Sequence, residues 1–337
     1  MPAPVVEASA PARVDLAGGT LDLWPLHVLH PGSVTVNVAI NRYARARVTA
    51  GVPDFRVVNP ASSFELRAGN PAELLADPRA ALVGALLEAM EIDEPLEIEL
   101  RSEIPFGSGL GGSSALAVCL MGALEKWSGC DLAGGDRVAF VRDVETRVLV
   151  KPAGVQDYYP PLEGGAHVIA FPPGHTAAKR FPVKAEDWTR HLIVLDSGAA
   201  HSSGMNNWEI YRARMEGDGA VAGRLDEIRS AAVDMADALV KEDFAAMGKA
   251  LRREWNARRR LAPVVSTPLI DHAIASAVDA GAWGGKACGA GGGGCVVFLS
   301  PEDRRDSVAK ELGNLGEGRV LEIRVVNEGL KAQEKRS

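Results

Sequence analysis

The chain of 337 residues has only four cysteines, at positions 119, 130, 288 and 295, and no two of them have C-x-x-C spacing. Cys119 falls on the apolar side of a predicted helix and Cys295 opens an apolar strand, which favours core packing over a disulfide framework. The seven histidines also lack paired metal-ligand spacing. These absences argue against a zinc site and favour a reducing compartment.

The sequence has neither an excess of basic residues nor a long apolar run. Its net charge of −7 argues against a nucleic-acid or membrane-surface protein. No apolar run is long enough to span a bilayer, and the first residues show neither a basic n-region nor an apolar h-region. With 47% apolar residues the chain can bury a real core. We therefore expect a soluble, cytoplasmic protein with one large or two moderate domains.

A glycine-rich stretch at residues 104–115, Ile-Pro-Phe-Gly-Ser-Gly-Leu-Gly-Gly-Ser-Ser-Ala, is the most informative part of the chain. It follows a strand pattern at 95–101 and precedes a helix pattern with apolar residues on one face. Glycines let a ligand approach the backbone, and the first turn of a helix offers unpaired N–H groups. This combination predicts an anion site, for which phosphate is the usual ligand.

Three interpretations of this stretch compete. Gly107, Gly109 and Gly112 satisfy G-x-G-x-x-G, but a second helix pattern follows where a dinucleotide fold requires a strand with an acidic residue. A Walker A loop is excluded because no Lys-Ser or Lys-Thr pair follows the glycines. A plain glycine turn with a serine cap is the remaining alternative to a phosphate site.

Periodicity predicts the elements of the first half of the chain. Strands are expected at 5–17, 34–40, 44–49, 55–58, 63–66 and 164–171, with the second and third forming a hairpin, and helices at 71–90 and 136–150. Residues 154–161 are expected to form a loop. The Pro-rich polar segment 172–184 predicts a boundary between an N-terminal lobe at 1–180 and a C-terminal lobe at 181–337.

The second half repeats this mixture of strands and helices. Strands are expected at 191–195, 295–299 and 319–326, and helices at 219–239, 243–260, 267–280 and 301–312. A polar loop at 196–204 and a second glycine-rich stretch at 281–294 are candidate site segments. Strands and helices in both halves indicate an α+β architecture.

The order of four segments resembles that of the GHMP kinases. They are Arg13 with a Gly-Gly-Thr-Leu-Asp turn at 18–22, the loop 105–114, Glu145 with Asp157, and the glycine loop 289–294. Residues 105–115 are similar to the phosphate loop of this superfamily, and residues 286–294 (Lys-Ala-Cys-Gly-Ala-Gly-Gly-Gly-Gly) to its third motif. All three motifs occur in order over most of the chain.

Within the superfamily, the bacterial D-glycero-D-manno-heptose kinases and the L-fucokinase kinase domain look most similar. The shared features are the turn at 18–22, the Gly-Val-Gln-Asp-Tyr-Tyr segment at 154–159 and the Asn-Glu-Gly ending at 327–329. Val155 departs from the lysine of the heptose kinases, Leu21 from their threonine, and the loop 201–204 lacks their arginine. The departures concern the identity of the sugar and any phosphate already on it.

The resemblance implies a role for each motif residue. Asp157 would take the acceptor proton or orient the hydroxyl, and Arg13 would neutralise charge on the transferring group. Glu145 with Ser113 or Ser114 would hold Mg²⁺, and Asp22 would accept hydrogen bonds from the sugar. The phosphate-binding residues would be Pro105, Gly107, Ser108, Gly109, Leu110, Gly111, Gly112, Ser113 and Ser114, and further substrate-binding residues would be Gly18, Gly19, Thr20, Gly291, Gly292 and Gly293.

Taken singly, these residues have plainer explanations. Asp157 and Asp22 also suit ordinary turns, and Glu145 suits a solvated helix face. Lys286 is interpreted as a surface lysine.

The resemblance implies a two-lobed fold, with a phosphate-loop lobe followed by a ferredoxin-like lobe and the active site between them. We expect a kinase that uses ATP and Mg²⁺ to phosphorylate a hydroxyl of a sugar or sugar phosphate, as a monomer or homodimer, without nucleic-acid or membrane partners. The alternatives are a catalytically silent sugar and ATP sensor, and a kinase or decarboxylase of the mevalonate branch.

Overall fold

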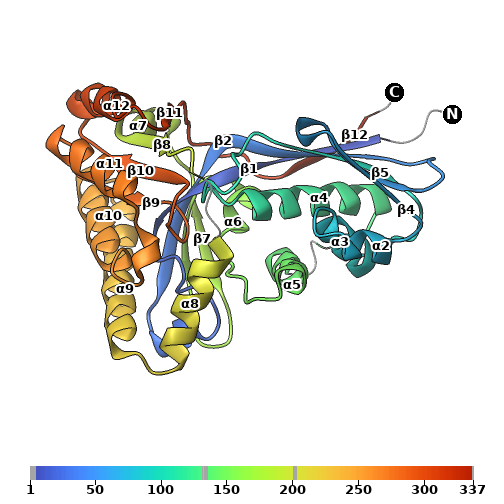
Figure 1. Ribbon diagram of the computed structural model, residues 1–337, viewed down its shortest axis with the longest axis horizontal. Coiled ribbons are helices and arrows are strands. Elements are labelled where there is room, and N and C mark those ends of the chain that lie inside the picture. The colour runs from blue at the N-terminus through green and yellow to red at the C-terminus, as the bar shows by residue number, and fades with distance from the viewer. Residues whose placement is uncertain (1–4, 131, 133–135, 200–202, 336–337) are drawn as a thin grey trace.

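Two β-sheets organise the chain in the computed structural model, which describes residues 5–130, 132, 136–199 and 203–335. Over these residues the chain forms one eight-stranded and one four-stranded sheet. The larger sheet and its helices make up the right-hand lobe in Figure 1, and the smaller sheet with α9 to α12 makes up the left-hand lobe. None of the described helices is both long and apolar enough to cross a membrane.

The larger sheet is built on the long strand β1 (Val5–Ala17), which pairs antiparallel with β2 (Val34–Thr49) and with β12 (Lys331–Lys335). Its order is β12-β1-β2-β5-β3-β4, and β6 and β7 continue from the other end of β2. The remaining strands are β3 (Phe55–Asn59), β4 (Phe64–Ala68), β5 (Glu97–Ser102), β6 (Ala166–Ala170) and β7 (Ala177–Phe181).

The hairpin predicted at 34–49 is wrong, because β2 is one continuous strand. Its register against β1 shifts at two places, and one of them falls at the predicted break, where Pro11 pairs with Tyr43 but the adjacent Ala12 pairs with Ile40. The interruption in the sequence pattern is therefore a bulge, which bends a strand without reversing it.

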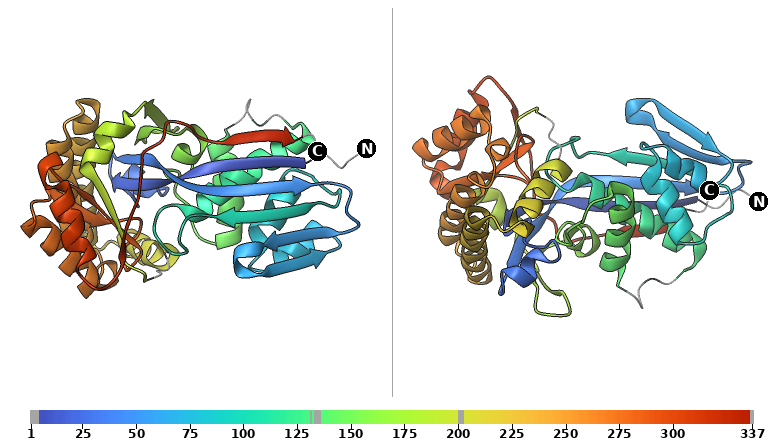
Figure 2. Two further views of the ribbon diagram at one scale, coloured as in Figure 1. Left: turned by 90° about the horizontal axis from the view of Figure 1, so that it is seen from above. Right: turned by 60° about the horizontal axis from the view of Figure 1, so that its bottom comes forward.

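The helices of this lobe lie on one face of the sheet, and the view from above shows the strands uncovered on the other face (Figure 2). They are α1 (Leu26–Leu29), α2 (Pro71–Ala76), α3 (Ala81–Ala89), α4 (Gly112–Ser128), α5 (Arg137–Leu149) and α6 (Tyr159–Glu163). The single helix predicted at 71–90 is wrong, because Asp77 precedes a proline and adopts an extended conformation between α2 and α3.

The smaller sheet has the order β11-β8-β10-β9, with every pair antiparallel. Its strands are β8 (Leu192–Asp196), β9 (Gly284–Ala287), β10 (Cys295–Leu299) and β11 (Arg319–Leu321). Helices lie between β8 and β9 and between β10 and β11, which is the βαββαβ arrangement of a ferredoxin-like lobe. The predicted α+β fold with such a second lobe is confirmed.

The helices of the second lobe are α7 (Ala185–His191), α8 (Ser203–Met215), α9 (Gly219–Val240), α10 (Phe244–Arg258), α11 (Pro268–Asp279) and α12 (Arg305–Gly313). Seven of the described α-helices and strands were not predicted: α1, α6, β7, α7, α8, β9 and β12. Helix α6 falls in the expected loop at 154–161, and β7 falls in the segment predicted as a boundary between the lobes. The strand expected at 319–326 ends at Leu321.

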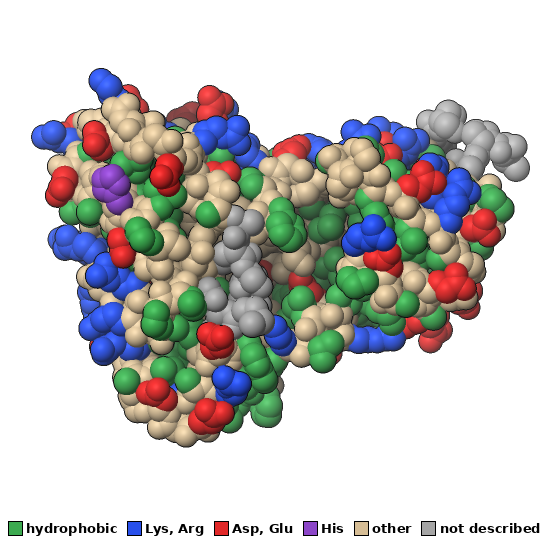
Figure 3. Space-filling view, in the orientation of Figure 1, with side chains coloured by type: hydrophobic (Ala, Val, Ile, Leu, Met, Phe, Trp, Pro, Cys, Tyr) green, Lys and Arg blue, Asp and Glu red, His purple; other side chains and the backbone are tan. Residues whose placement is uncertain are grey.

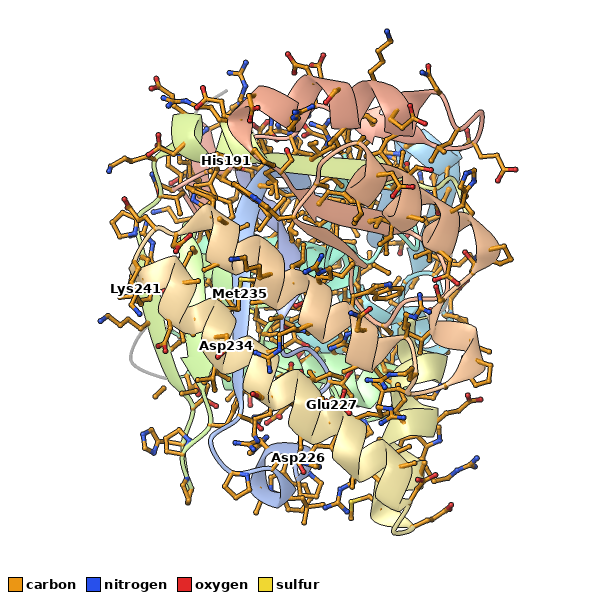
Figure 4. The ribbon with its side chains drawn as sticks, turned by 90° about the vertical axis from the view of Figure 1, so that its left-hand side faces the viewer. His191, Asp226, Glu227, Asp234, Met235 and Lys241 are labelled. Atoms are coloured by element: carbon orange, nitrogen blue, oxygen red, sulfur yellow. The ribbon has the colours of Figure 1, made fainter. Side chains whose placement is uncertain are left out.

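Helices α9 and α10 join the second lobe to the first. Ion pairs from Arg253 to Asp234 and from Arg260 to Glu227 tie their exposed sides together, and Figure 4 shows Asp234 and Glu227 along α9. Met235 is fully buried and packs into the same core as β1 and β2. The main core therefore extends from the first lobe into the second, and a second core lies between the small sheet and the helices α11 and α12. Strand β12, from the end of the chain, belongs to the first sheet. The boundary at residue 180 stays a prediction.

Candidate active site

The glycine-rich loop lies at the surface where β5 leads into α4. Gly107, Gly109 and Gly111 all have positive φ angles, which glycine adopts without strain. Gly111 is the N-cap of α4, so the first amides of the helix lack intrahelical partners. Ser113 is exposed, whereas Leu110 is buried and anchors the loop. Figure 3 shows the surface hollowed in front of α4, between the two lobes. The loop thus has the geometry of an anion site.

Arg13 connects this loop to Asp157. The Nε and Nη2 atoms of Arg13 lie 2.8 Å and 2.7 Å from Oδ1 of Asp157, and Nη1 donates to the carbonyl of Gly109 at 2.5 Å. Arg13 is buried, while the side chain of Asp157 is 28% exposed. Burial alone would lower the pKa of Arg13, but the carboxylates of Asp157 and Asp15 raise it, so its charge is fixed.

Glu145, on α5, faces the serines in the first turn of α4. Its carboxylate accepts hydrogen bonds from Ser113 at 2.5 Å, from Ser114 at 3.0 Å and from the Tyr158 hydroxyl at 2.7 Å. Burial raises the pKa of Glu145 and outweighs these three hydrogen bonds, which lower it. The plainer interpretation as a solvated helix charge is wrong, because Glu145 is buried and faces the loop serines.

Asp22 is buried in the turn after β1, beside the segment that carries Asp157. Its Oδ2 accepts a hydrogen bond from the Gln156 amide at 3.1 Å, and a Cβ on Gly154 would lie 1.9 Å from the same oxygen. Burial, together with the charge of Asp157, raises the pKa of Asp22 to about 6. Asp22 and Asp157 therefore share one electrostatic environment, and glycine at 154 is what allows their segments to meet.

The turn at Gly18, Gly19 and Thr20 faces the second lobe. The Thr20 hydroxyl donates to Oδ1 of Asn207 at 2.9 Å and accepts from Nη1 of Arg258 at 3.2 Å. The Gly19 carbonyl accepts from Nη2 of Arg258 at 2.7 Å. Because the Thr20 hydroxyl already bonds to Asn207 and Arg258, any contact of Thr20 with a substrate would come from its backbone.

The glycine loop of the third motif packs against the phosphate loop. A Cβ on Gly109 would lie 2.4 Å from the carbonyl oxygen of Cys288, and the Cys295 amide donates to the Ser108 carbonyl at 2.7 Å. The Gly292 amide donates to the Val265 carbonyl at 2.8 Å. The structure therefore joins two predicted motifs that lie about half the chain apart. The predicted contact of Gly291, Gly292 and Gly293 with a substrate stays a prediction.

Lys286 is fully buried, so its interpretation as a surface lysine is wrong. Its Nζ lies 2.8 Å from Oδ2 of Asp15 and 3.3 Å from Oε1 of Glu254, and the same Oε1 accepts from Arg258. These four residues alternate in charge across the junction of β1, β9 and α10. The charge of Lys286, acting against the effect of burial, lowers the pKa of Asp15.

Sequence reasoning missed Tyr158, Gln156, Glu254 and Arg258. A signal existed for the last two, because Glu254 and Arg258 are spaced i, i+4 on the apolar side of a predicted helix, where buried charges must pair. Tyr158 and Gln156 adjoin Asp157 in the chain, but only the fold turns them towards Glu145 and Asp22. In the polar loop at 196–204, residues 200–202 lie outside the described residues.

A glycine-rich loop at a helix N-terminus, with a carboxylate held beside it by arginine, defines a site suited to phosphoryl transfer. The chain matches the GHMP kinases N-terminal domain model over residues 79–165 and the GHMP kinases C-terminal model over residues 235–318, together just over half of its length. The chain belongs to the GHMP kinases. Members of this family are phosphotransferases with ATP as the phosphate donor.

The relatives that match over nearly the whole chain are also kinases. The chain is 24% identical to the D-glycero-alpha-D-manno-heptose 7-phosphate kinase of Campylobacter jejuni over 97% of this chain and 98% of that protein. It is 26% identical to the mevalonate kinase of Thermococcus gammatolerans over 98% of each chain. The crystal structure of a D-glycero-D-manno-heptose 1-phosphate kinase from Bacteriodes thetaiotaomicron has a TM-score of 0.79 at 21% identity, over 98% of this chain and all of that one, which shows the shared fold.

Proposed function

We propose that the protein transfers the γ-phosphoryl group of ATP to a hydroxyl of a sugar or sugar phosphate. The observation that carries this proposal is the pairing of Asp157 with Arg13, next to the phosphate loop. A carboxylate there can accept or orient the acceptor proton, and a fixed guanidinium can neutralise charge that develops on the transferring group. A silent sensor needs neither group.

The donor phosphates would bind at residues 105–114 and the first turn of α4. The amides of Gly112, Ser113 and Ser114 point out of the helix end, where the dipole favours negative charge. The acceptor would lie on the other side of Arg13, among Asp22, the turn at 18–20 and the third-motif glycines. This arrangement puts Asp157 between the donor and acceptor sites.

Magnesium fits the oxygen donors at the start of α4. Ser113, Ser114 and Glu145 present two hydroxyls and one carboxylate within hydrogen-bond reach of each other, and Mg²⁺ prefers such hard ligands together with substrate phosphates. Among the described residues no cluster of three or more His, Cys, Asp or Glu side chains could hold a metal alone. When bound, the ion would neutralise charge on the donor phosphates, and these three residues would hold it beside the loop.

Similarity over nearly the whole chain holds for both a heptose-phosphate kinase and a mevalonate kinase, so coverage does not choose between the two acceptors. A sugar acceptor is favoured over mevalonate by the Gly-Gly-Thr-Leu-Asp turn at residues 18–22, which resembles that of the sugar kinases. The buried carboxylate of Asp22, aimed at the loop of Asp157, is a suitable acceptor of hydroxyl hydrogen bonds. We further propose that the protein is cytoplasmic and acts as a monomer or homodimer, without nucleic-acid or membrane partners.

The test is ADP release from Mg-ATP across hexoses, heptoses, their phosphates, uronates, inositols and mevalonate, with CO₂ release from mevalonate diphosphate as a separate arm. We expect turnover with a sugar or sugar phosphate. Turnover confined to mevalonate would identify a mevalonate kinase instead of a sugar kinase, and CO₂ release from mevalonate diphosphate would identify a decarboxylase. Binding of ATP and a sugar without any turnover would identify a sensor.

A further inference from the structure

Thr20 adopts a backbone conformation that its side chain disfavours. Its φ is 76°, in the left-handed region that β-branched residues rarely enter, and it follows Gly18 at φ 87° in the same turn. Strained residues of this kind persist only where the surrounding structure holds them, and they concentrate at functional sites. The turn at residues 18–20 lies between β1, which carries Arg13, and Asp22.

The groups that hold this turn come from the second lobe. Arg258 donates to the Gly19 carbonyl through Nη2 and to the Thr20 hydroxyl through Nη1, while the Thr20 hydroxyl donates to Asn207 of α8. The planar guanidinium can make both contacts at once because its donors form a fixed fork.

Arg258 is itself held in place. It is 1% exposed, and its Nε donates to Oε1 of Glu254 at 2.7 Å. That oxygen also accepts from Lys286, which in turn binds Asp15, two residues after Arg13 on β1. A chain of charge-assisted hydrogen bonds therefore runs from the turn at residues 18–20 to β1, the strand that carries Arg13.

We propose that Arg258 is a positioning residue for the acceptor, fixing the turn at residues 18–20 so that its backbone and Asp22 meet the acceptor hydroxyls. This inference rests on the proposed kinase function. Arg258 acts through Gly19 and Thr20 and does not touch the reacting atoms. Loss of its fork lets the turn relax, which misplaces the acceptor and leaves the donor site intact.

The kinetic test compares Arg258→Lys with Arg259→Lys. The second is a matched control, because Arg259 is the next residue and forms a half-exposed ion pair with Asp271. For Arg258→Lys we expect the KM of the best sugar acceptor to rise at least tenfold and kcat/KM to fall up to about 100-fold, a loss typical of a small misplacement. The KM of ATP should change less than twofold, and the control should match the wild type.

Thr20 supplies a second, independent variant. Thr20→Val keeps the shape of the side chain but removes the hydroxyl, and should reproduce the selective rise in acceptor KM. Thr20→Ser keeps the hydroxyl and should have the acceptor KM of the wild type. If Arg258 had only a structural role, Arg258→Lys would have a lower melting temperature than the wild type but the same KM and kcat per folded molecule. That result would overturn the proposal.

Hydrogen exchange separates this inference from the proposed function. The Leu21 amide donates a hydrogen bond to the Gly18 carbonyl, and the Leu23 amide donates one to the Thr20 carbonyl. Arg258→Lys should speed exchange at residues 18–23 and leave the amides of α4 unchanged. If the wild type turns over no acceptor, the kinase proposal fails, yet exchange still decides whether Arg258 fixes the turn. Unchanged exchange at 18–23 would contradict the inference in either case.

Discussion

Arg13 holds Asp157 through two nitrogens on a single carboxylate oxygen, at 2.8 Å and 2.7 Å, and the two residues lie 144 positions apart in the chain. The third guanidinium nitrogen donates to the carbonyl of Gly109 in the phosphate loop. One buried side chain thus fixes the proposed base relative to the donor site. Charge-assisted contacts of this kind are strong and directional, which suits a residue that must face an acceptor hydroxyl.

Asp157→Asn removes the proton acceptor but preserves the size of the side chain. We expect kcat to fall by roughly 10²–10⁴-fold, the range for losing a proton-transfer group, with ATP affinity retained. Steady-state ADP release and calorimetric ATP titration measure the two effects. Asp143→Asn, at an exposed position on α5, is the control. Near-full turnover of Asp157→Asn would refute its role as base.

Glu145→Gln tests the magnesium site. A neutral amide removes charge from the oxygen donors beside Ser113 and Ser114, so the Mg²⁺ concentration for half-maximal rate should rise at least about tenfold at fixed ATP. The acceptor KM should stay constant. Titration of activity with Mg²⁺ measures this shift, with exposed Glu186→Gln as the control. An unaltered Mg²⁺ dependence would exclude Glu145 as a ligand.

The raised pKa of Asp22 predicts that the free energy of unfolding depends on pH. Its pKa is raised from 3.8 to about 6 in the folded state, so the neutral carboxyl favours folding. This stability is fully present below about pH 3.8 and is lost as pH rises through 6. The loss is about 3 kcal/mol for a shift of about two pKa units.

The comparison with Asp22→Asn isolates this contribution, because asparagine keeps an acceptor for the Gln156 amide and does not titrate. Urea unfolding of both proteins between pH 4 and pH 7 should show the free energy of unfolding of wild type falling relative to the variant as pH rises. A difference that is flat across this range would show that Asp22 titrates normally.

Lys286→Met removes the cation between two buried carboxylates. Asp15 and Glu254 are both fully buried, so the variant leaves charge uncompensated and should lose about 3–5 kcal/mol of unfolding free energy. Lys184→Met breaks only an exposed pair with Glu242 and should cost no more than about 1 kcal/mol. Denaturant unfolding compares them, and equal losses would mean that the buried network contributes no more than a surface pair.

Gly109→Ala tests the contact between the two glycine loops. Gly109 has φ of 73°, and a Cβ would lie 2.4 Å from the carbonyl oxygen of Cys288. Gly174 has φ of 89° with nothing within 4 Å of a Cβ, so Gly174→Ala bears only the conformational strain. That strain is about 1–2 kcal/mol, and Gly109→Ala should lose clearly more. Thermal unfolding ranks the two variants, and equal loss would show that the loops can separate freely.

The sequence by itself determined the α+β class, the position of β1 and β10 to the residue, the glycine loop before α4 and the family. Glycine spacing, period-two strands and apolar helix faces are local signals, and local sterics and hydrogen bonding enforce them. Because these signals are local, they also explain why the sequence predicted a hairpin at 34–49 and missed β9. The bulge in β2 breaks the period without ending the strand, and β9 is made of glycines and a lysine that have little strand preference.

Only the tertiary structure decided which distant residues meet. No local pattern distinguishes Lys286 from a surface lysine, because its burial depends on carboxylates from β1 and α10 that the fold brings to it. The spacing of Glu254 and Arg258 indicates a pair on one helix, but only the fold brings Arg258 to Gly19 and Thr20. The pairing of Arg13 with Asp157, and of Glu145 with Ser113, likewise joins segments separated by 144 and 32 positions. Burial and charge pairing are properties of the assembled lobes, since desolvation forces each buried charge to find a partner that chain order does not reveal.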